Sequence, residues 1–145
     1  MSSNLTVTLE HDPSAELTQP IRQGLIAFNQ AHAGAQNPRH YALVVRDEGH
    51  VLGGLIAEEH WGWLYIGWLW LPDSLRGRGL GSRLLQEAEK IGAANGCRYA
   101  YLSTFAFQAL PFYQRHGYAA WGTLDDFPVG SGFSRYYLRK DLTHG

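Results

Sequence analysis

The sequence predicts an α/β fold in one domain over residues 1–145, built on a mixed, mostly antiparallel central sheet. Two strand hairpins come first, an amphipathic helix at 80–95 follows them, and a strand-like segment comes directly after that helix. A strand that follows a helix commonly returns beside the strand that precedes it, so we expect one parallel pair within the sheet. The length suffices for one hydrophobic core and is too short for two domains.

The N-terminal region carries the weakest pattern. Val7 and Leu9 alternate with polar residues, so we expect a short strand that ends by Pro13. From residue 14 to 32 the apolar residues have helical spacing, and Pro20 interrupts it. This region is therefore expected to form one or two helices.

Two hairpins are expected next. Residues 40–46 form a strand-like run, a turn at 47–50 follows, and 51–57 continues as the partner strand. A second turn between 59 and 62 leads into a long strand at 63–71. A bulge in that long strand would change which of its tryptophans face inward.

The helix at 80–95 has the clearest pattern. Its apolar residues repeat with helical spacing and leave the charged residues on the opposite face. Gly96 supplies a residue suited to the left-handed conformation that often ends a helix. The remaining expected elements are a strand at 98–104, a short helix at 108–116, and strands at 118–124 and 133–142.

A basic, glycine-rich turn joins the long strand to this helix. Such a turn presents unpaired backbone N–H groups and the positive end of the helix dipole to an anion. A Walker A loop would need Lys-Ser or Lys-Thr after its last glycine, whereas Gly81 is followed by Ser82 and Arg83. A dinucleotide loop would need G-x-G-x-x-G, but Gly77, Gly79 and Gly81 alternate strictly. The spacing therefore argues against both kinds of nucleotide loop.

The motif that does fit is Arg76-x-x-Gly79-x-Gly81, which resembles the acetyl-CoA signature R/Q-x-x-G-x-G/A of the GNAT family of N-acetyltransferases. A second segment, ALPFYQRHGY at 109–118, resembles that family's A-x-x-F-Y-x-x-x-G-[FY] segment. The expected order of elements, β-α(α)-βββ-α-β-α-ββ, is also the order of that family. The resemblance therefore implies a GNAT-like sheet whose parallel pair is splayed at the cofactor site.

The same resemblance implies transfer of an acetyl group from acetyl-CoA to an amine, with no metal. It assigns Leu69 and Leu71 to the pantetheine arm through their backbones, and Tyr113 to protonation of the departing thiolate, a role that suits a neutral phenol. The alternative role for Tyr113 is packing. Gln108 stands where many members carry Asn, so a cofactor contact there is not carried over. The residues assigned to the pyrophosphate are Arg76, Arg78, Gly79, Gly81 and Ser82.

An acceptor amine must lose a proton before it attacks a thioester. With a pKa of about 10.4, only about one alkyl ammonium in a thousand is neutral at pH 7.5, a cost of about 4 kcal/mol. Glu58, Glu59 and His60 are the candidate proton acceptors at the end of the third predicted strand, and each is also an ordinary hairpin residue. The spacing of the histidines predicts no metal site.

The acceptor itself is expected to be the primary amine of a small molecule. Carboxylates near aromatic rings favour a cationic guest, and both kinds of side chain are predicted at the rim of the cleft. Acetylation of protein N-termini or lysines, and a non-catalytic acyl-CoA-binding sensor module, remain the alternatives. The rim residues are Glu58, Glu59, Asp125, Asp126, Trp61 and Trp63.

Composition limits the partners and the location that we expect. A net charge of −1 and a pI near 6.6 give no basic surface of the kind that nucleic acid requires. Cys97 is the single cysteine, and no apolar run reaches transmembrane length. We therefore expect a cytoplasmic protein with neither nucleic-acid nor membrane partners, and a homodimer through the C-terminal strands stays open.

Overall fold

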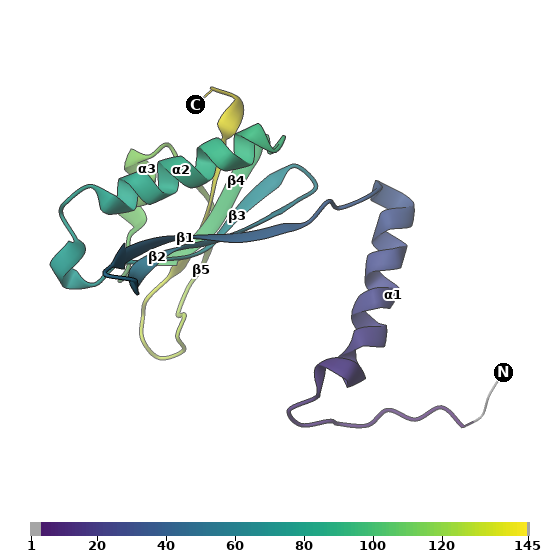
Figure 1. Ribbon diagram of the computed structural model, residues 1–145. Helices are drawn as coiled ribbons and strands as arrows, with labels where there is room; N and C mark the ends of the chain where they lie inside the picture. The colour runs from purple at the N-terminus through teal and green to yellow at the C-terminus, as the bar shows by residue number, and fades with distance from the viewer. Residues whose placement is uncertain (1–3, 145) are drawn as a thin grey trace. The chain divides into compact units, whose positions relative to one another are not determined.

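The computed structural model describes residues 4–144. The chain forms two compact units, Met1–Gln36 and Asn37–Gly145. In the described residues the first unit contains a single helix, and the second contains the sheet with its helices (Figure 1). No helix in the described part of the chain combines the length and the apolar character needed to cross a lipid bilayer.

The first unit is dominated by α1 (Ala15–Ala33). Ser14 caps this helix, because its hydroxyl accepts a hydrogen bond of 3.0 Å from the backbone N–H of Leu17. Pro20 lies inside α1, which continues through it as one helix rather than two. Proline lacks one donor and crowds the preceding turn, so it weakens the ladder at one point.

The strand predicted at Val7–Leu9 is not formed. Residues 4–10 belong to no strand, and Leu5, Val7 and Leu9 are exposed. An alternating pattern forms a stable strand only where a neighbouring strand pairs with its N–H and C=O groups, and the described part of the first unit contains no strand. Within its own unit, α1 buries none of its residues.

The second unit is a six-stranded sheet in the order β1-β2-β3-β4-β6-β5. β3 and β4 are parallel, and every other neighbouring pair is antiparallel, which confirms the predicted mixed sheet with one parallel pair. The strands are β1 (Arg39–Asp47), β2 (His50–His60), β3 (Trp63–Trp70), β4 (Tyr99–Phe105), β5 (Ala119–Leu124) and β6 (Arg135–Asp141). The helices are α2 (Leu80–Ala94) and α3 (Leu110–Arg115), with short 3-10 turns at Asp73–Leu75 and Leu142–His144.

Both predicted hairpins are present and are closed by two-residue turns. Glu48 and Gly49 have φ values of 49° and 83°, and Trp61 and Gly62 have φ values of 48° and 79°. Positive φ at both central residues matches the right-handed twist of the flanking strands, as in type I′ turns. The second turn is therefore tighter than the sequence indicated.

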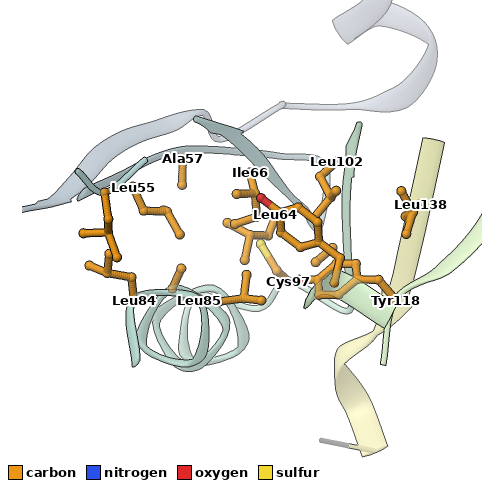
Figure 2. Close-up of a cluster of buried hydrophobic side chains, with 14 residues drawn as sticks. Leu55, Ala57, Leu64, Ile66, Leu84, Leu85, Cys97, Leu102, Tyr118 and Leu138 are labelled. Carbon is orange, nitrogen blue, oxygen red and sulfur yellow. The ribbon is translucent and has the colours of Figure 1, made fainter. Parts of the chain in front are cut away.

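The core lies between the sheet and α2, with α3 on the same side of the sheet (Figure 1). Figure 2 shows Leu55 of β2 and Leu64 of β3 on the side of the sheet that faces Leu84 and Leu85 of α2. The helix approaches closely at Gly92, where an added Cβ would lie 3.1 Å from the side chain of Leu64. The most deeply buried large side chains are Leu55, Leu64, Leu85, Leu102 and Leu138.

The opposite face of the sheet, which we call the open face, is covered by no helix of residues 37–144. A bulge in β3 determines which side chains lie on it. Ala57 pairs with Ile66 and Ile56 pairs with Trp68, which leaves Gly67 as the extra residue. After the bulge the alternation is reversed, so Trp68 and Trp70 point to the open face and are 72% and 59% exposed.

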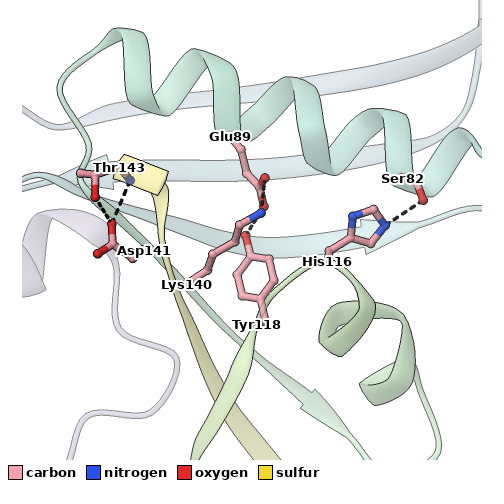
Figure 3. Close-up of polar contacts among 7 residues, drawn as sticks. All are labelled: Ser82, Glu89, His116, Tyr118, Lys140, Asp141 and Thr143. Carbon is pink, nitrogen blue, oxygen red and sulfur yellow. Dashed lines mark hydrogen bonds and ion pairs between the residues drawn. The ribbon is translucent and has the colours of Figure 1, made fainter. Parts of the chain in front are cut away.

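A partly buried trio of polar side chains fixes α2 to the C-terminal half of the sheet (Figure 3). The Glu89 carboxylate of α2 accepts hydrogen bonds of 2.8 Å from both the Tyr118 hydroxyl and the Lys140 ammonium. Burial and the Glu89 charge raise the pKa of Tyr118, so its hydroxyl stays a donor. This contact holds the helix that begins at the glycine loop in a fixed position over the sheet.

Candidate active site

The parallel strands β3 and β4 separate partway along their length. Their pairing covers Trp63↔Tyr99, Leu64↔Ala100 and Tyr65↔Tyr101, and it stops there although the strands continue to Trp70 and Phe105. The edge of β3 that faces β4 therefore has unpaired backbone groups beyond Tyr65, available to an extended ligand that carries amides of its own.

The glycine loop lies at the far end of this gap and opens onto α2. Gly77 and Gly79 have φ values of 75° and 78°, and a Cβ added to either would meet no atom within 4 Å. Gly79 is the N-cap of α2 and provides no side-chain cap, so the first-turn N–H groups remain open to a ligand. The space in front of these glycines and the free donors suit a pyrophosphate group.

The two arginines predicted to bind that anion differ in their contacts. The Arg76 guanidinium donates to the backbone oxygen of Leu71 at 2.9 Å and contacts the Asp73 carboxylate at 2.8 Å. It therefore braces the loop against the end of β3. Arg78 is exposed and, within residues 4–144, bonds no protein group, so its guanidinium is the one available to a ligand.

Tyr113 of α3 is buried on the core side, with 7% of its surface exposed. In the described residues its hydroxyl bonds no protein group. Burial raises the pKa of Tyr113 to about 12, which keeps the phenol protonated at neutral pH. Gln108 is engaged in the turn before α3, because its side-chain oxygen accepts a 2.8 Å hydrogen bond from the N–H of Phe105.

The structure separates the two glutamates that the sequence grouped together. Glu59 is 4% exposed on the core side, where its carboxylate accepts hydrogen bonds from the Tyr41 hydroxyl and from Asn95. Burial and this charge raise the pKa of Cys97 to about 11. Glu58 points to the open face and is exposed, and its charge contributes to the raised pKa of Tyr101. Of these two glutamates, only Glu58 lies on the open face.

A cavity of about 600 Å³ opens on the same face of the sheet. The Tyr101 hydroxyl lies 3.3 Å from His60 Nε2 in its wall. The Arg139 guanidinium lies 5.0 Å above the centre of the Trp63 ring. We call this space the aromatic cavity, and it is lined by His60, Trp61, Trp63, Tyr101, Trp121 and Arg139.

Asp125 and Asp126, predicted at the rim, do not line the aromatic cavity. Asp125 accepts a hydrogen bond of 3.0 Å from the Ser134 hydroxyl. Asp126 accepts from the backbone N–H groups of Gly130 and Gly132, which hold the pKa of its carboxyl below the usual value. Both carboxylates therefore stabilise the loop between β5 and β6.

The sequence profile of the Acetyltransferase (GNAT) family matches residues 7–118. The chain belongs to the acetyltransferase (GNAT) family. An acetyltransferase of Agrobacterium fabrum is 37% identical over 127 residues, which cover 87% of this chain and 91% of that protein. The blasticidin-S acetyltransferase of Streptomyces morookaense is 38% identical over 97 residues, covering 66% of this chain and 70% of that protein.

The GNAT assignment extends to three dimensions. The crystal structure of a protein from Agrobacterium tumefaciens, assigned as an acetyltransferase, superposes with a TM-score of 0.87 at 34% sequence identity. The match covers 94% of this chain and 99% of that one. The six-stranded mixed sheet described above is therefore the GNAT sheet, as the sequence predicted.

The two GNAT-like motifs of the sequence lie together in space at the start of α2. Ser82 Oγ lies 2.8 Å from His116 Nε2, which joins α2 to the end of α3 (Figure 3). Phe112 packs beside Gly81, where an added Cβ would lie 3.5 Å from the ring. His116 therefore supports the glycine loop through Ser82. Both residues belong to the two motifs, but the spacing of the motifs did not predict that they are in contact.

Three residues of the aromatic cavity were missed by the sequence reading of this GNAT chain: Tyr101, Trp121 and Arg139. They come from β4, β5 and β6, and the strand order β4-β6-β5 brings them together. The alternation of side chains along 99–105 and 135–141 was the available signal. It divides each strand into two faces, but which of them lies on the open face is known only once the neighbouring strand is known. Trp61, Trp63 and His60 were identified as candidates from the hairpin alone.

Proposed function

We propose that this GNAT protein transfers the acetyl group of acetyl-CoA to a primary amine of a small molecule. The observation that carries the proposal is the gap between β3 and β4. It reaches the glycine loop at one end, and it begins at Tyr101, which also lines the aromatic cavity. A donor in the gap and an acceptor in the cavity would therefore meet beside the last paired residues of the two strands.

Acetyl-CoA would supply an acetyl thioester as the electrophile. The backbone N–H groups at the start of α2 would bind its pyrophosphate. Gly79 would allow close approach, Gly81 and Ser82 would contribute from the first turn of α2, and Arg76 and Arg78 would add positive charge. The backbone of Leu69 on the free edge of β3, and that of Leu71 just after the strand, would pair with the amides of the pantetheine arm.

Two side chains would handle the protons. Glu58, directly or through water, would accept the proton that the ammonium loses before it attacks the thioester. Its place on the open face beside Tyr65 supports this role. Tyr113 would donate a proton to the departing sulfur, because its raised pKa keeps the phenol intact and its hydroxyl bonds no protein group in the described residues.

A small acceptor is supported by the cavity and by one relative. A space of about 600 Å³ walled by aromatic rings accommodates a small molecule. Blasticidin-S acetyltransferase, to which this chain is 38% identical over 97 residues, is named for a small-molecule acceptor.

The test is an acceptor panel of free amines, amino acids and peptides, read out by release of the coenzyme A thiol, with acetyl-CoA affinity measured separately by calorimetry. Turnover of free amines would support the proposal. Efficient turnover of peptides alone would indicate a protein acetyltransferase. Tight binding of acetyl-CoA without release in the presence of any amine would indicate a non-catalytic binding module.

A further inference from the structure

β6 presents two guanidinium groups to the open face. Arg139 is the cross-strand partner of Tyr101, and Arg135 is the partner of Phe105. They lie four positions apart in the sequence, about 13 Å along β6. Both arginines therefore lie next to β4, one beside the last pair of β3 and β4 and the other at the end of β4.

Aromatic rings support both guanidiniums. The Arg139 guanidinium lies 5.0 Å from the ring centre of Trp63 and 5.2 Å from that of Tyr99. The Arg135 guanidinium lies 5.2 Å from the ring centre of Phe105, and its Nε and Nη2 atoms donate to the Ser103 hydroxyl at 3.1 and 2.7 Å. Stacking against rings restricts the side-chain rotamers and orients each guanidinium before any ligand arrives.

Neither charge is neutralised by the protein. Within residues 4–144 no carboxylate lies within ion-pair distance of Arg135 or Arg139, and Arg139 bonds no protein group at all. Arg135 uses two of its N–H groups on Ser103, whereas the N–H groups of Arg139 make no hydrogen bond within residues 4–144 and remain open to a ligand. Those donors form a fork that matches the geometry of a carboxylate or a phosphate.

The opposite charge lies at the other end of the same row of residues. Cross-strand partners lead from Glu58 to Tyr65, from Tyr65 to Tyr101, and from Tyr101 to Arg139. The row spans three strand spacings, about 14 Å between the outer backbones, and the long side chains shorten that gap. The middle of the row is where pairing of β3 and β4 ends, which is also where the proposed reaction takes place.

We propose that the acceptor carries an anionic group, a carboxylate or a phosphate, in addition to its amine. Arg139 binds the anionic group in the aromatic cavity, while the amine points along the row towards Glu58 and the gap. Arg135 extends the positive potential of this face without lining the cavity. This inference rests on the proposed function and specifies its substrate class.

The test uses matched acceptors that differ only in the anionic group. ω-Amino carboxylates are compared with n-alkylamines of the same chain length, and O-phosphoethanolamine is compared with ethanolamine. We expect kcat/KM to be about tenfold or more higher for the anionic member of at least one pair, as a charge-assisted bidentate contact would give. A larger ratio of kcat/KM in the amino carboxylate pairs would indicate a carboxylate site, and a larger ratio in the phosphoethanolamine pair would indicate a phosphate site.

Arg139→Gln should bring the ratio of kcat/KM between the two members of each pair close to one, and Arg139→Lys should restore only part of that ratio. Arg46→Gln, which removes the same charge from the end of β1, is the control and should keep the preference. Equal kcat/KM within every pair, or a preference that survives Arg139→Gln, would overturn the inference.

Equilibrium binding separates this inference from the proposed reaction. Calorimetry with the same pairs of compounds measures recognition even where no acetyl group is transferred. Binding of the anionic members that weakens in Arg139→Gln, without turnover of any amine, would support the anion site and refute the acetyl transfer. Turnover of amines at equal kcat/KM within every pair would support the acetyl transfer and refute the anion site.

Discussion

Glu58 and Arg139 stand at the two ends of one row of side chains that crosses four strands of the sheet, with Tyr65 and Tyr101 between them. The two tyrosine rings lie 4.9 Å apart, centre to centre, at the last pair before β3 and β4 separate. The row therefore marks the boundary between the closed part of the sheet and the gap. It also places a negative side chain on the β2 side and a positive side chain on the β6 side of the β3–β4 pair.

Gly79→Val should weaken acetyl-CoA binding about tenfold or more, because a side chain would fill the space in front of the loop and would strain a residue at φ 78°. Calorimetry measures the affinity, and circular dichroism checks the fold. Gly49→Val is the matched control, since Gly49 has a φ of 83° and equally open surroundings in the turn between β1 and β2. Unchanged affinity in a folded Gly79→Val protein would remove the loop from the donor site.

Tyr113→Phe should lower kcat by about 10²-fold while acetyl-CoA affinity is kept, because the ring that packs in the core remains and only the proton donor is lost. The pKa of Tyr113, raised to about 12, lies above the working range, so the wild-type rate should show no alkaline loss from this group up to about pH 10. Steady-state kinetics from pH 6 to 10 measure both effects. A kcat within about twofold of wild type would make Tyr113 a packing residue.

Glu58→Gln should lower kcat/KM about tenfold at pH 7, because the acceptor would then have to arrive already neutral. The defect should shrink as the pH rises towards the pKa of the amine, since the neutral fraction grows without help from the protein. A pH profile of kcat/KM for one amine, in wild type and variant, measures this change. Identical profiles would assign the proton to another group or to bulk water.

Glu59→Gln should act on stability instead. The buried Glu59 carboxylate accepts hydrogen bonds from Tyr41 and Asn95. A neutral amide would replace these charge-assisted contacts, so we expect a loss of about 1–3 kcal/mol in the free energy of unfolding. Denaturant titration measures it. A variant of unchanged stability with an altered pH profile of kcat/KM would instead give Glu59 a role in proton transfer.

Local patterns were enough to predict most of the second unit. Helical spacing located α2, turn residues located both hairpins, and the helix between two strands predicted the parallel pair of β3 and β4. The strand at Val7–Leu9 failed because the pattern cannot show whether a partner strand is present. The position of the bulge could not be predicted from residues 63–70 either. Both faces of that strand are apolar or aromatic, so the sequence fits a regular strand and a bulged one equally well.

The candidate site was predicted in the parts that are contiguous in sequence. The glycine loop and the segment around Tyr113 are local motifs, so their residues could be named before their positions were known. Glu58 and Glu59 could not be told apart in the same way, because adjacent residues of a strand point to opposite faces and the inward face depends on the whole sheet. Arg139 required the strand order as well.

The open face also gives the protein an optical property. All five tryptophans of the chain lie on that face or at its turns and edge, and none of them is buried. The hydrophobic core of β2, β3, β4 and α2 contains no tryptophan. Intrinsic fluorescence therefore reports the surroundings of the open face rather than the packing of the core, and a quenching titration can follow occupancy of the aromatic cavity without any label. The five residues are Trp61, Trp63, Trp68, Trp70 and Trp121.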